Sequence, residues 1–417
     1  MIDLNWLKDN LEEYKKSLVN RQMKLEEFKL DEILRLYADK KKISAELQEL
    51  QRKRNTLGGK IQEAEKAKEI KKNISELNLK NREIIENLYK LEVKLPNILS
   101  PDVPIGKNES ENKEIEKWGE IPKFNFTLKD HLEIGKNLNL IDMGKASIVS
   151  GARFYYLKNE AVLIEFALLD FVFKMLIKQG FIPVIPPVMV KSGIMKKMGK
   201  ERFISDSDAF YVEKDDLYLV GSAEHTIGPL HMDDVLKEED LPKRYVGFST
   251  SFRREAGSYG KDTRGILRAH QFDKIEMFSF AHPDKSEEEH QLLLSMQKKI
   301  MQALELSYRV IILCSGDTGI TDFKQYDLET WIQTQNKYRE THSCSNVGEY
   351  QSRGINTRYK NKETGKNQYA HTLNATGIAI GRVLIAILEN NQQQNGSVKV
   401  PKVLQDYIGK SLITMNK

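Results

Sequence analysis

The chain has 417 residues, of which 40% are hydrophobic and 30% are charged, and its formal net charge is +5. This length allows two or three domains with ordinary cores, and so mild a charge does not by itself indicate a nucleic-acid partner. The chain has only two cysteines, Cys314 and Cys344, which excludes a disulfide framework and a cysteine-rich metal site.

The beginning of the chain gives no sign of export. The start, MIDLNWLKDN, is acidic and amphipathic, unlike a secretory signal or an arginine-rich transit peptide. No apolar run approaches the ~20 residues that a membrane-spanning helix needs. We therefore expect a soluble protein without membrane contact, in a reducing compartment such as the cytoplasm.

The first 100 residues predict a helical arm. Residues 4–24 are expected to form one short helix. From about residue 30, apolar side chains recur at alternating steps of three and four residues, which is the heptad pattern of a coiled coil. The pattern occurs in two runs: Ile33, Leu36, Ile43, Leu47, Leu50, Leu57 and Ile61, then Ile70, Ile74, Leu77, Asn81, Ile84, Leu88, Leu91 and Leu95.

We interpret the two runs as an antiparallel coiled-coil hairpin over about 29–96, with helices ~35–45 Å long. The turn is expected near 63–68, and Gly58-Gly59 is expected to fray or bend the first helix, since glycine costs ~1 kcal/mol against alanine there. Such an arm has too little core to be an enzyme. It could be a spacer or dimerisation coiled coil, or a rigid arm whose lysines and arginines meet phosphates. The arm alone leaves both functions open.

A linker follows the arm. Pro96 ends the second helix, and residues 96–120 contain three prolines among many polar side chains. We place a domain boundary near residue 100, which gives an arm domain over 1–100 and a second domain over 101–417.

The second domain alternates helices with strands. Helices are expected over 130–138, 161–179 and 287–306, and strands over 308–316 and 323–332. The run FIPVIPPVMV, residues 181–190, is β-rich, but its prolines exclude a central strand and favour an edge or an interface. An apolar helix followed by such a strand is the kind of surface that two subunits bury together.

The stretch from Thr250 to Phe280 predicts a long β-hairpin. Two runs of alternating polar and apolar residues flank a loop that contains Gly257, Gly260 and Gly265. The predicted tip carries Lys261, Asp262 and Arg264.

One face of this hairpin carries a mixed set of side chains. Residues i and i+2 of a strand share a face, so Arg253 is expected to lie beside Glu255, and Phe272, Lys274 and Glu276 to lie together. Guanidinium, carboxylate and aromatic groups on one face suit a ligand with phosphate, amine and a flat base. The alternative is a solvated face with cross-strand charge pairs.

The common catalytic motifs are absent. The sequence has no GxxxxGK[ST], no strand–GxGxxG–helix, no HExxH and no GxSxG. The eight histidines lack ligand spacing. The arginines of the hairpin could bind phosphate oxygens bidentately, and Glu340 with Ser343 could hold Mg²⁺ through oxygen atoms. If a carboxylate attacks an α-phosphate, positioning and charge neutralisation can supply most of the rate.

Several segments resemble one family. FRREAGSYGKDTRGILRAHQFDKIEMF resembles motif 2 of the class II aminoacyl-tRNA synthetases, in the form typical of seryl-tRNA synthetases, and NATGIAIGRVLIAILENNQ resembles motif 3. Residues 171–190 resemble motif 1, ETHSCSN resembles the E-x-S-S-C-S-N segment, and GSAEH resembles the T-x-E serine-binding segment. The resemblance covers nearly the whole chain in the right order, and motif 2 is highly specific.

The resemblance implies an α+β fold: an antiparallel β-sheet flanked by helices, preceded by the coiled-coil arm. It also implies ATP as a substrate, bound by Arg253, Arg254, Glu255, Ala269, Phe272, Glu340, Thr341, His342, Ser343 and Arg382. Arg253 and Arg382 would be catalytic, and Glu340 and Ser343 would carry Mg²⁺. Serine would be bound by Ser222, Ala223, Glu224, Arg253, Glu276, Asn374 and Thr376.

The resemblance further implies the partners. The arm would bind the long variable arm of tRNA(Ser), the motif 2 loop over 258–265 would touch the acceptor end, and motif 1 would form a homodimer. The activity would be serine–tRNA ligation, extending to tRNA(Sec). The alternatives are a paralogue that passes an activated amino acid to a carrier protein, and a non-catalytic RNA-binding protein.

Three positions depart from the usual pattern of the family. Ser222 replaces the threonine of T-x-E, Thr376 replaces the motif 3 serine, and His342 replaces the first serine of the S-S pair. A pocket built from glutamate and hydroxyl groups should still prefer a substrate that has a hydroxyl. The added methyl of Thr376 would help to exclude threonine, whereas His342 could offset that effect.

Overall fold

The computed structural model describes residues 1–56, 64–256 and 264–415. The chain divides into two compact units, Met1–Pro96 and Asn97–Lys417. Each unit is described by itself. Within the described residues, no helix combines the length and the apolar character that a membrane crossing requires.

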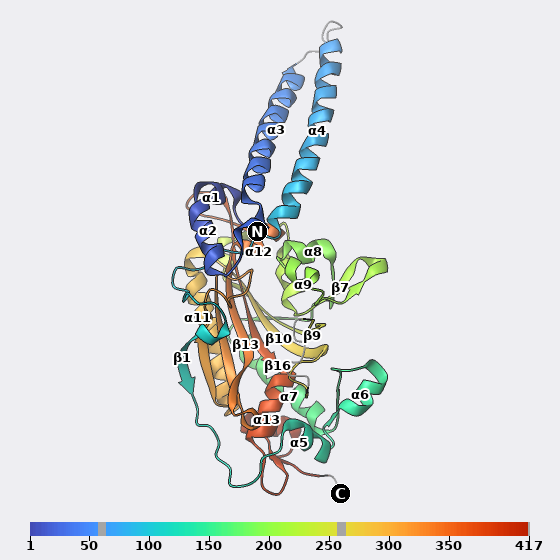
Figure 1. The fold of residues 1–417 in the computed structure, drawn as a ribbon, viewed down its shortest axis with the longest axis vertical. Helices are drawn as coiled ribbons and strands as arrows, with labels where there is room; N and C mark the ends of the chain where they lie inside the picture. Colours follow the sequence, from blue (N-terminus) through green and yellow to red (C-terminus); the bar gives the residue numbers. More distant parts are fainter. Residues whose placement is uncertain (57–63, 257–263, 416–417) are drawn as a thin grey trace. The chain divides into compact units, whose positions relative to one another are not determined.

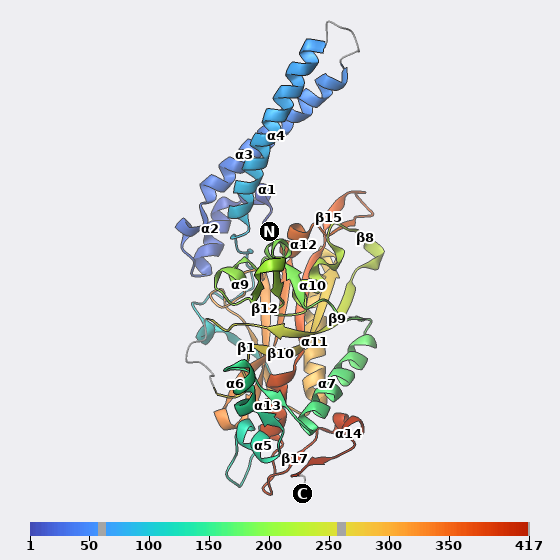
Figure 2. The same cartoon turned by 90° about the vertical axis from the view of Figure 1, so that its right-hand side faces the viewer.

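The first unit is helical. It contains α1 (Leu4–Asp9), α2 (Leu11–Asn20), the short 3-10 helix η1 (Leu25–Phe28), α3 (Leu30–Thr56) and α4 (Ala64–Glu92). The long helices α3 and α4 run side by side in opposite directions (Figures 1 and 2). Their heptad side chains Ile33, Leu36, Leu47, Ile74 and Leu88 are buried. The predicted antiparallel hairpin is therefore present.

Two details of this unit differ from the prediction. The single helix expected over 4–24 is broken, because Asn10 leaves helical geometry and its backbone N–H and side-chain amide both donate to Trp6 O. The predicted turn near 63–68 is wrong for residues 64–68, which already belong to α4. Leu57, Gly58-Gly59, Ile61 and residue 63 lie outside the described residues.

The second unit is built on a large sheet. In the described part of the chain this sheet has eight strands in the order β1-β11-β12-β13-β16-β10-β9-β4. Every neighbouring pair is antiparallel except β4 and β9, which are parallel. The strands are β1 (Lys113–Trp118), β11 (Tyr308–Ile312), β12 (Lys324–Ile332), β13 (Lys337–Gly348), β16 (His371–Ala379), β10 (Gln271–Ala281), β9 (Lys243–Phe252) and β4 (Ile182–Val184).

Helices cover this sheet and complete the core. The helices α7 (Glu160–Ile177), α11 (Ser286–Ala303) and α13 (Ile380–Asn390) pack on its strands (Figure 1). Their apolar side chains join those of the strands in one continuous core, which makes the sheet a rigid platform for side chains at its edges and ends.

Shorter elements surround the platform. The small sheets are β2 (Ile141–Asp142) with β3 (Tyr156–Leu157), β5 (Met189–Lys191) with β7 (Leu217–Leu219) and β6 (Tyr211–Val212), β15 (Asn367–Tyr369) with β14 (Arg358–Lys360) and β8 (Val235–Lys237), and β17 (Val398–Lys399) with β18 (Leu412–Ile413). The shorter helices are α5 (His131–Asn137), α6 (Met143–Ser150), α8 (Ser192–Lys197), α9 (Glu201–Ser205), α10 (Glu224–Ile227), α12 (Tyr350–Ile355) and α14 (Lys402–Ile408).

The sequence predicts several of the longer elements. The predicted helices over 130–138, 161–179 and 287–306 correspond to α5, α7 and α11. The proline-rich run supplies β4, which lies at the edge of the large sheet as predicted.

The hairpin from Thr250 to Phe280 is formed by β9 and β10, which pair in regular antiparallel register from Phe252–Gln271 onward. The prediction that Arg253 and Glu255 share a strand face is wrong, because β9 ends at Phe252 and Glu255 has a left-handed backbone with φ of +53°. The predicted tip residues Gly257, Gly260, Lys261 and Asp262 lie outside the described residues.

Candidate active site

Two neighbouring pockets lie at the C-terminal end of β9 and along β10, β13 and β16. We call the first the Arg382 pocket. Its described lining is Arg253, Glu255, Ile266, Leu267, Arg268, Ala269, Phe272, Lys274, Glu340, Thr341, Ser343, Thr376, Ala379, Gly381 and Arg382. Arg382 reaches the pocket because α13 begins at Ile380, directly after β16, so the first turn of the helix stands at the end of the strand.

The Arg382 pocket combines an aromatic ring with cations and acceptors. The guanidinium of Arg253 lies 5.4 Å from the ring centroid of Phe272, and its Nε donates to Gly221 O at 3.1 Å. Arg268 pairs with Glu255 at 3.1 Å. Such a set can bind a flat base through the ring and phosphates through the guanidinium groups.

Glu340 and Arg382 face each other in this pocket. Arg382 Nη1 lies 3.1 Å from Glu340 Oε2 and donates to Glu340 O at 2.9 Å. Desolvation raises the pKa of the Glu340 carboxyl, but the Arg382 guanidinium outweighs it and holds the pKa below its usual value. Glu340 is therefore a carboxylate at neutral pH and can accept hydrogen bonds or bind a cation.

We call the second pocket the Glu224 pocket. Its described lining is Gly199, Lys200, Arg202, Phe203, Asp208, Gly221, Ser222, Glu224, His225, Arg253, Lys274, Gly319, Ile320, Thr321, Asp322, Gln325, Ser343, Ser345 and Asn374. Glu224 Oε1 lies 2.7 Å from Lys200 Nζ and accepts from Gln351 Nε2 at 2.7 Å. Burial raises the pKa of Glu224, but the ammonium of Lys200 reverses the effect and lowers the pKa to about 2.

Buried acid–hydroxyl contacts lie beside Glu224. Ser222 Oγ donates to Glu276 Oε2 at 2.8 Å, and Lys274 forms an ion pair with the same carboxylate oxygen. Thr376 Oγ1 lies 3.4 Å from Ser343 Oγ. Ionised carboxylates and hydroxyls at this spacing can hold an ammonium and a hydroxyl of a small ligand.

The two pockets meet. Arg253, Lys274 and Ser343 line both of them. A ligand in one pocket can therefore present a reacting group to a ligand in the other, with two cations at the junction.

Most of the predicted site residues lie together here, but four of them do not line either pocket. Among the described lining, Ala223, Arg254, Glu276 and His342 are missing. Glu276 is buried behind Ser222 and Lys274. The guanidinium of Arg254 instead stacks on Phe210, 4.3 Å from the ring centroid.

His342 is fully buried, and its Nδ1 lies 2.9 Å from Thr341 Oγ1. Burial and the nearby Lys274 lower the pKa of His342 to about 3, so the imidazole is neutral. This geometry gives His342 no direct approach to a ligand in either pocket.

Two lysines of the site have no role that the sequence alone predicts. The sequence places Lys274 on the hairpin face, and its position between Phe272 and Glu276 on one strand is a signal for a role at the junction. Lys200 follows α8 and lies outside every motif. No local pattern pointed to it, because the tertiary fold alone brings it to Glu224.

Magnesium has suitable donors in the Arg382 pocket. Glu340, whose side chain is 46% exposed, and Ser343 both offer oxygen atoms to the pocket. Among the described residues, no group of three or more His, Cys, Asp or Glu side chains could hold a metal ion. Mg²⁺ usually keeps several waters and binds one or two protein oxygens with substrate phosphates. Glu340 and Ser343 fit such an ion, which would arrive with a phosphorylated ligand.

Comparisons with known proteins agree across the chain. Residues 1–100 match the model of the seryl-tRNA synthetase N-terminal domain, and residues 210–391 match the tRNA synthetase class II core domain (G, H, P, S and T). The chain is 42% identical to the serine–tRNA ligase of Dictyoglomus turgidum over the full length of both. It is 37% identical to that of Nitrosopumilus maritimus over 98% of this chain and 99% of the relative.

A solved structure agrees as well. The seryl-tRNA synthetase from Pyrococcus horikoshii, complexed with ATP, matches with a TM-score of 0.90 and 37% identity over all of both chains. These likenesses confirm the predicted fold class and the predicted family. The chain belongs to the seryl-tRNA synthetase family of class II aminoacyl-tRNA synthetases.

Proposed function

We propose that this protein is a serine–tRNA ligase. It activates L-serine with ATP to seryl-adenylate, releasing pyrophosphate, and transfers the seryl group to the terminal adenosine of tRNA(Ser). The observation that carries the proposal is the junction of the two pockets at Arg253 and Lys274. ATP and an amino acid must meet at such a point, with their negative charges neutralised.

ATP is assigned to the Arg382 pocket. Phe272 stacks on the adenine, with Glu255 and the backbone at Ala269 beside it, and all three residues line this pocket. Arg253 holds the α-phosphate at the junction, and Arg382 pairs with the outer phosphates. The Phe272 ring and the guanidinium groups supply the stacking and the bidentate phosphate contacts that this placement needs.

Serine is assigned to the Glu224 pocket. Its ammonium pairs with Glu224 and Ser222, which line this pocket. Its hydroxyl is received at the junction of the two pockets by Glu276, buried against Ser222 and Lys274, and by Thr376 of the adjoining Arg382 pocket. The depressed pKa of Glu224 supports this placement, because an ionised acceptor attracts an ammonium. The Ser222–Glu276 hydrogen bond places the two acceptor groups side by side.

The residues of the chain catalyse the reaction by holding and neutralising the substrates. Arg253 and Lys274 draw the serine carboxylate and the α-phosphate together, and their charges oppose the repulsion between the two anions. Glu340 and Ser343 would hold Mg²⁺, which neutralises phosphate charge when bound. Attack of the carboxylate oxygen on the α-phosphorus expels pyrophosphate and requires no protein nucleophile.

A second copy of the chain is proposed to cover the apolar surface of α7 and β4. Phe166 on α7 is 52% exposed, and Ile185, just after β4, is 84% exposed. Leu163, Ile177 and Ile182 are also exposed on these two elements, which pack on each other. So many large apolar side chains on one surface indicate an interface, and the motif 1 resemblance favours a homodimer.

The arm is proposed to bind tRNA(Ser), and also tRNA(Sec), through phosphate and shape contacts. Its match to the seryl-tRNA synthetase N-terminal domain supports this role. We also propose that the protein works in the cytoplasm, where tRNA is charged. The loop proposed to touch the acceptor end lies largely outside the described residues.

Charging of total tRNA tests the proposal against the carrier-protein alternative. A ligase esterifies a serine-specific tRNA fraction, and deletion of residues 30–95 should abolish that charging while serine activation persists. Activation without charging by the full chain would favour the carrier-protein paralogue. Unchanged charging after the deletion would contradict the role of the arm.

A further inference from the structure

One wall of the Arg382 pocket, residues 266–269, does not belong to a β-strand. Residues Ile266, Leu267, Arg268 and Ala269 line the pocket, but β10 begins only at Gln271. The ladder hydrogen bonds that fix Phe272 therefore do not fix this wall. Its position must come from contacts to another part of the fold.

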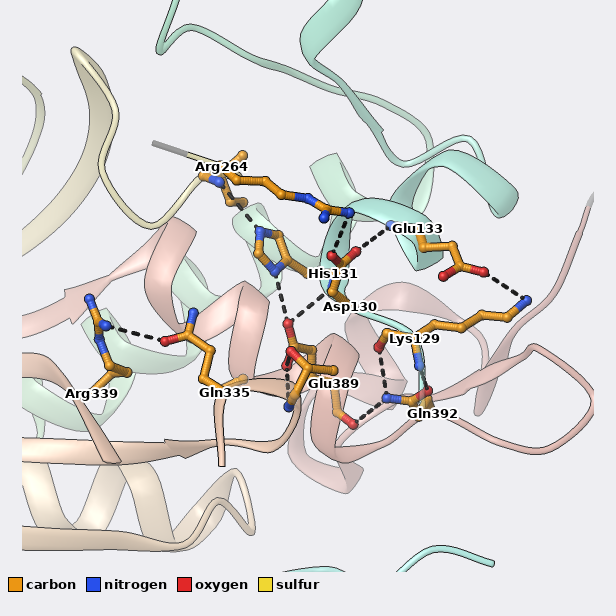
Figure 3. Close-up of polar contacts among 12 residues, drawn as sticks. Lys129, Asp130, His131, Glu133, Arg264, Gln335, Arg339, Glu389 and Gln392 are labelled. Atoms are coloured by element: carbon orange, nitrogen blue, oxygen red, sulfur yellow. Dashed lines mark hydrogen bonds and ion pairs between the residues drawn. The ribbon is translucent and has the colours of Figure 1, made fainter. Parts of the chain in front are cut away.

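The first turn of α5 supplies those contacts (Figure 3). Ile266 N donates to His131 Nε2 at 3.4 Å, and Arg264 Nη2 lies 2.9 Å from Asp130 Oδ2. Between them, Gly265 has φ of +90°, and a Cβ on it would lie 2.2 Å from His131 Nε2. Only glycine allows the chain to approach the imidazole this closely.

His131 is itself held by Glu389. His131 Nδ1 lies 2.8 Å from Glu389 Oε1, and the His131 backbone N donates to the same oxygen at 3.1 Å. Glu389 Oε2 accepts from the backbone N and the hydroxyl of Thr334. A carboxylate on Nδ1 requires Nδ1–H, which leaves Nε2 of a neutral imidazole as the acceptor for Ile266 N–H.

Glu389 also connects His131 to the element that carries Arg382. It lies in α13, the helix that carries Arg382 in its first turn. The two residues are seven positions apart, which is about two turns, so they project from nearly the same side of the helix. The helix α13 therefore carries Arg382 directly, and it also holds the 266–269 wall through Glu389 and His131.

We propose that His131 is a positioning residue for ATP: it sets the spacing between the 266–269 wall and Arg382. The inference rests on the proposed assignment of ATP to the Arg382 pocket. The competing role is purely structural, in which His131 stabilises the fold without affecting ATP affinity.

The variant His131→Asn should remove the contact between residue 131 and Ile266 while keeping the contact to Glu389. Its amide can still donate to Glu389 in place of Nδ1, but it is too short to accept from Ile266. We expect the Kd for ATP and the KM for ATP to rise about three- to tenfold, the range for one lost hydrogen bond. The KM for serine should stay within about twofold, because the Glu224 pocket does not use this wall.

A second variant keeps the imidazole but separates it from the wall, because a Cβ on residue 265 would lie 2.2 Å from His131 Nε2. Gly265→Ala forces the wall away from His131, and the KM for ATP should rise as in His131→Asn. The matched control is His231→Asn, which removes hydrogen bonds to Asp234 and Tyr245 away from both pockets. It should change only the thermal midpoint.

Calorimetric titration with ATP in the absence of serine measures the Kd for ATP without any contribution from amino-acid binding, and so tests the positioning role of His131. An unchanged Kd in both His131→Asn and Gly265→Ala would overturn the proposal, as would equal rises in the KM for ATP and for serine. If the wild type bound ATP but did not activate serine, the proposed ligase function would be wrong. The ratio of the Kd for ATP in each variant to that in the wild type would still test the role of His131. A wild type that does not bind ATP would contradict both the proposed ligase function and the positioning role of His131.

Discussion

Lys200 Nζ lies 2.7 Å from Glu224 Oε1 in a pocket where both side chains are largely buried. Lys200 comes from the segment after α8, whereas Glu224 begins α10. The lysine keeps Glu224 ionised against the effect of burial. In the proposed serine site, the ionisation of Glu224 thus depends on a cation that lies outside the motifs named above.

Substitution Lys200→Met should raise the KM for serine about three- to tenfold at pH 7. Lys200 is the largest of the influences that lower the pKa of Glu224, so without its ammonium burial outweighs more of them and the pKa rises from about 2. A carboxylate with a raised pKa becomes protonated at a higher pH. The KM for serine of the variant should therefore rise further between pH 7 and pH 5, whereas the KM of the wild type should not change over this range. The KM for ATP should not change.

The matched variant Lys200→Arg keeps the cation and should largely preserve the wild-type pH profile. A pH-independent KM in Lys200→Met would contradict the electrostatic role. A lower KM would show that Lys200 competes with the substrate ammonium instead.

Arg253→Ala should reduce adenylate formation by about 10²–10³-fold or more, because it removes a cation from the point where the reacting groups meet. Arg253→Lys keeps the charge but loses the planar fork, and it should recover only part of the rate. The measurement is pyrophosphate exchange at saturating ATP and serine. Near-normal exchange in Arg253→Ala would show that the reacting groups do not meet at the junction of the two pockets.

Glu276→Gln should lower the preference for serine over alanine by at least about tenfold, since the site would lose the charged acceptor of the serine hydroxyl. The glutamine keeps the volume of the buried side chain, which limits damage to packing. The ratio of kcat/KM for the two amino acids in the exchange assay checks this. An unaltered ratio would show that another group receives the hydroxyl.

Ile185→Asp should weaken the proposed homodimer, because it places a charge in the apolar surface formed by α7 and β4. Sedimentation velocity should show monomer at concentrations where the wild type is dimeric. Ile105→Asp is the control, since Ile105 is 64% exposed and lies outside α7 and β4. If the two variants sediment alike, the interface lies elsewhere.

The regular parts of the fold could be predicted from local periodicity. The 3-4 heptads indicated α3 and α4, and strict alternation indicated β9 and β10, because these patterns repeat along one element. The end of β9 was missed, since a left-handed residue such as Glu255 leaves no periodic signal.

The site could be predicted only where motifs carry it. Phe272, Glu340 and Arg382 lie in such motifs and line the Arg382 pocket. The His131–Glu389 contact joins residues 258 positions apart, and only the folded sheet and helices bring them together. His342 was assigned to the ATP site by its motif position, but β13 turns its side chain into the core.

Serine-dependent pyrophosphate exchange with ATP tests the central claim most directly. The purified chain should exchange pyrophosphate into ATP when serine is present and far less with alanine or threonine, and the exchange should fall by about 10²-fold or more in Arg253→Ala. Absence of serine-dependent exchange, or equal exchange with all three amino acids, would contradict the assignment of ATP and serine to the two joined pockets.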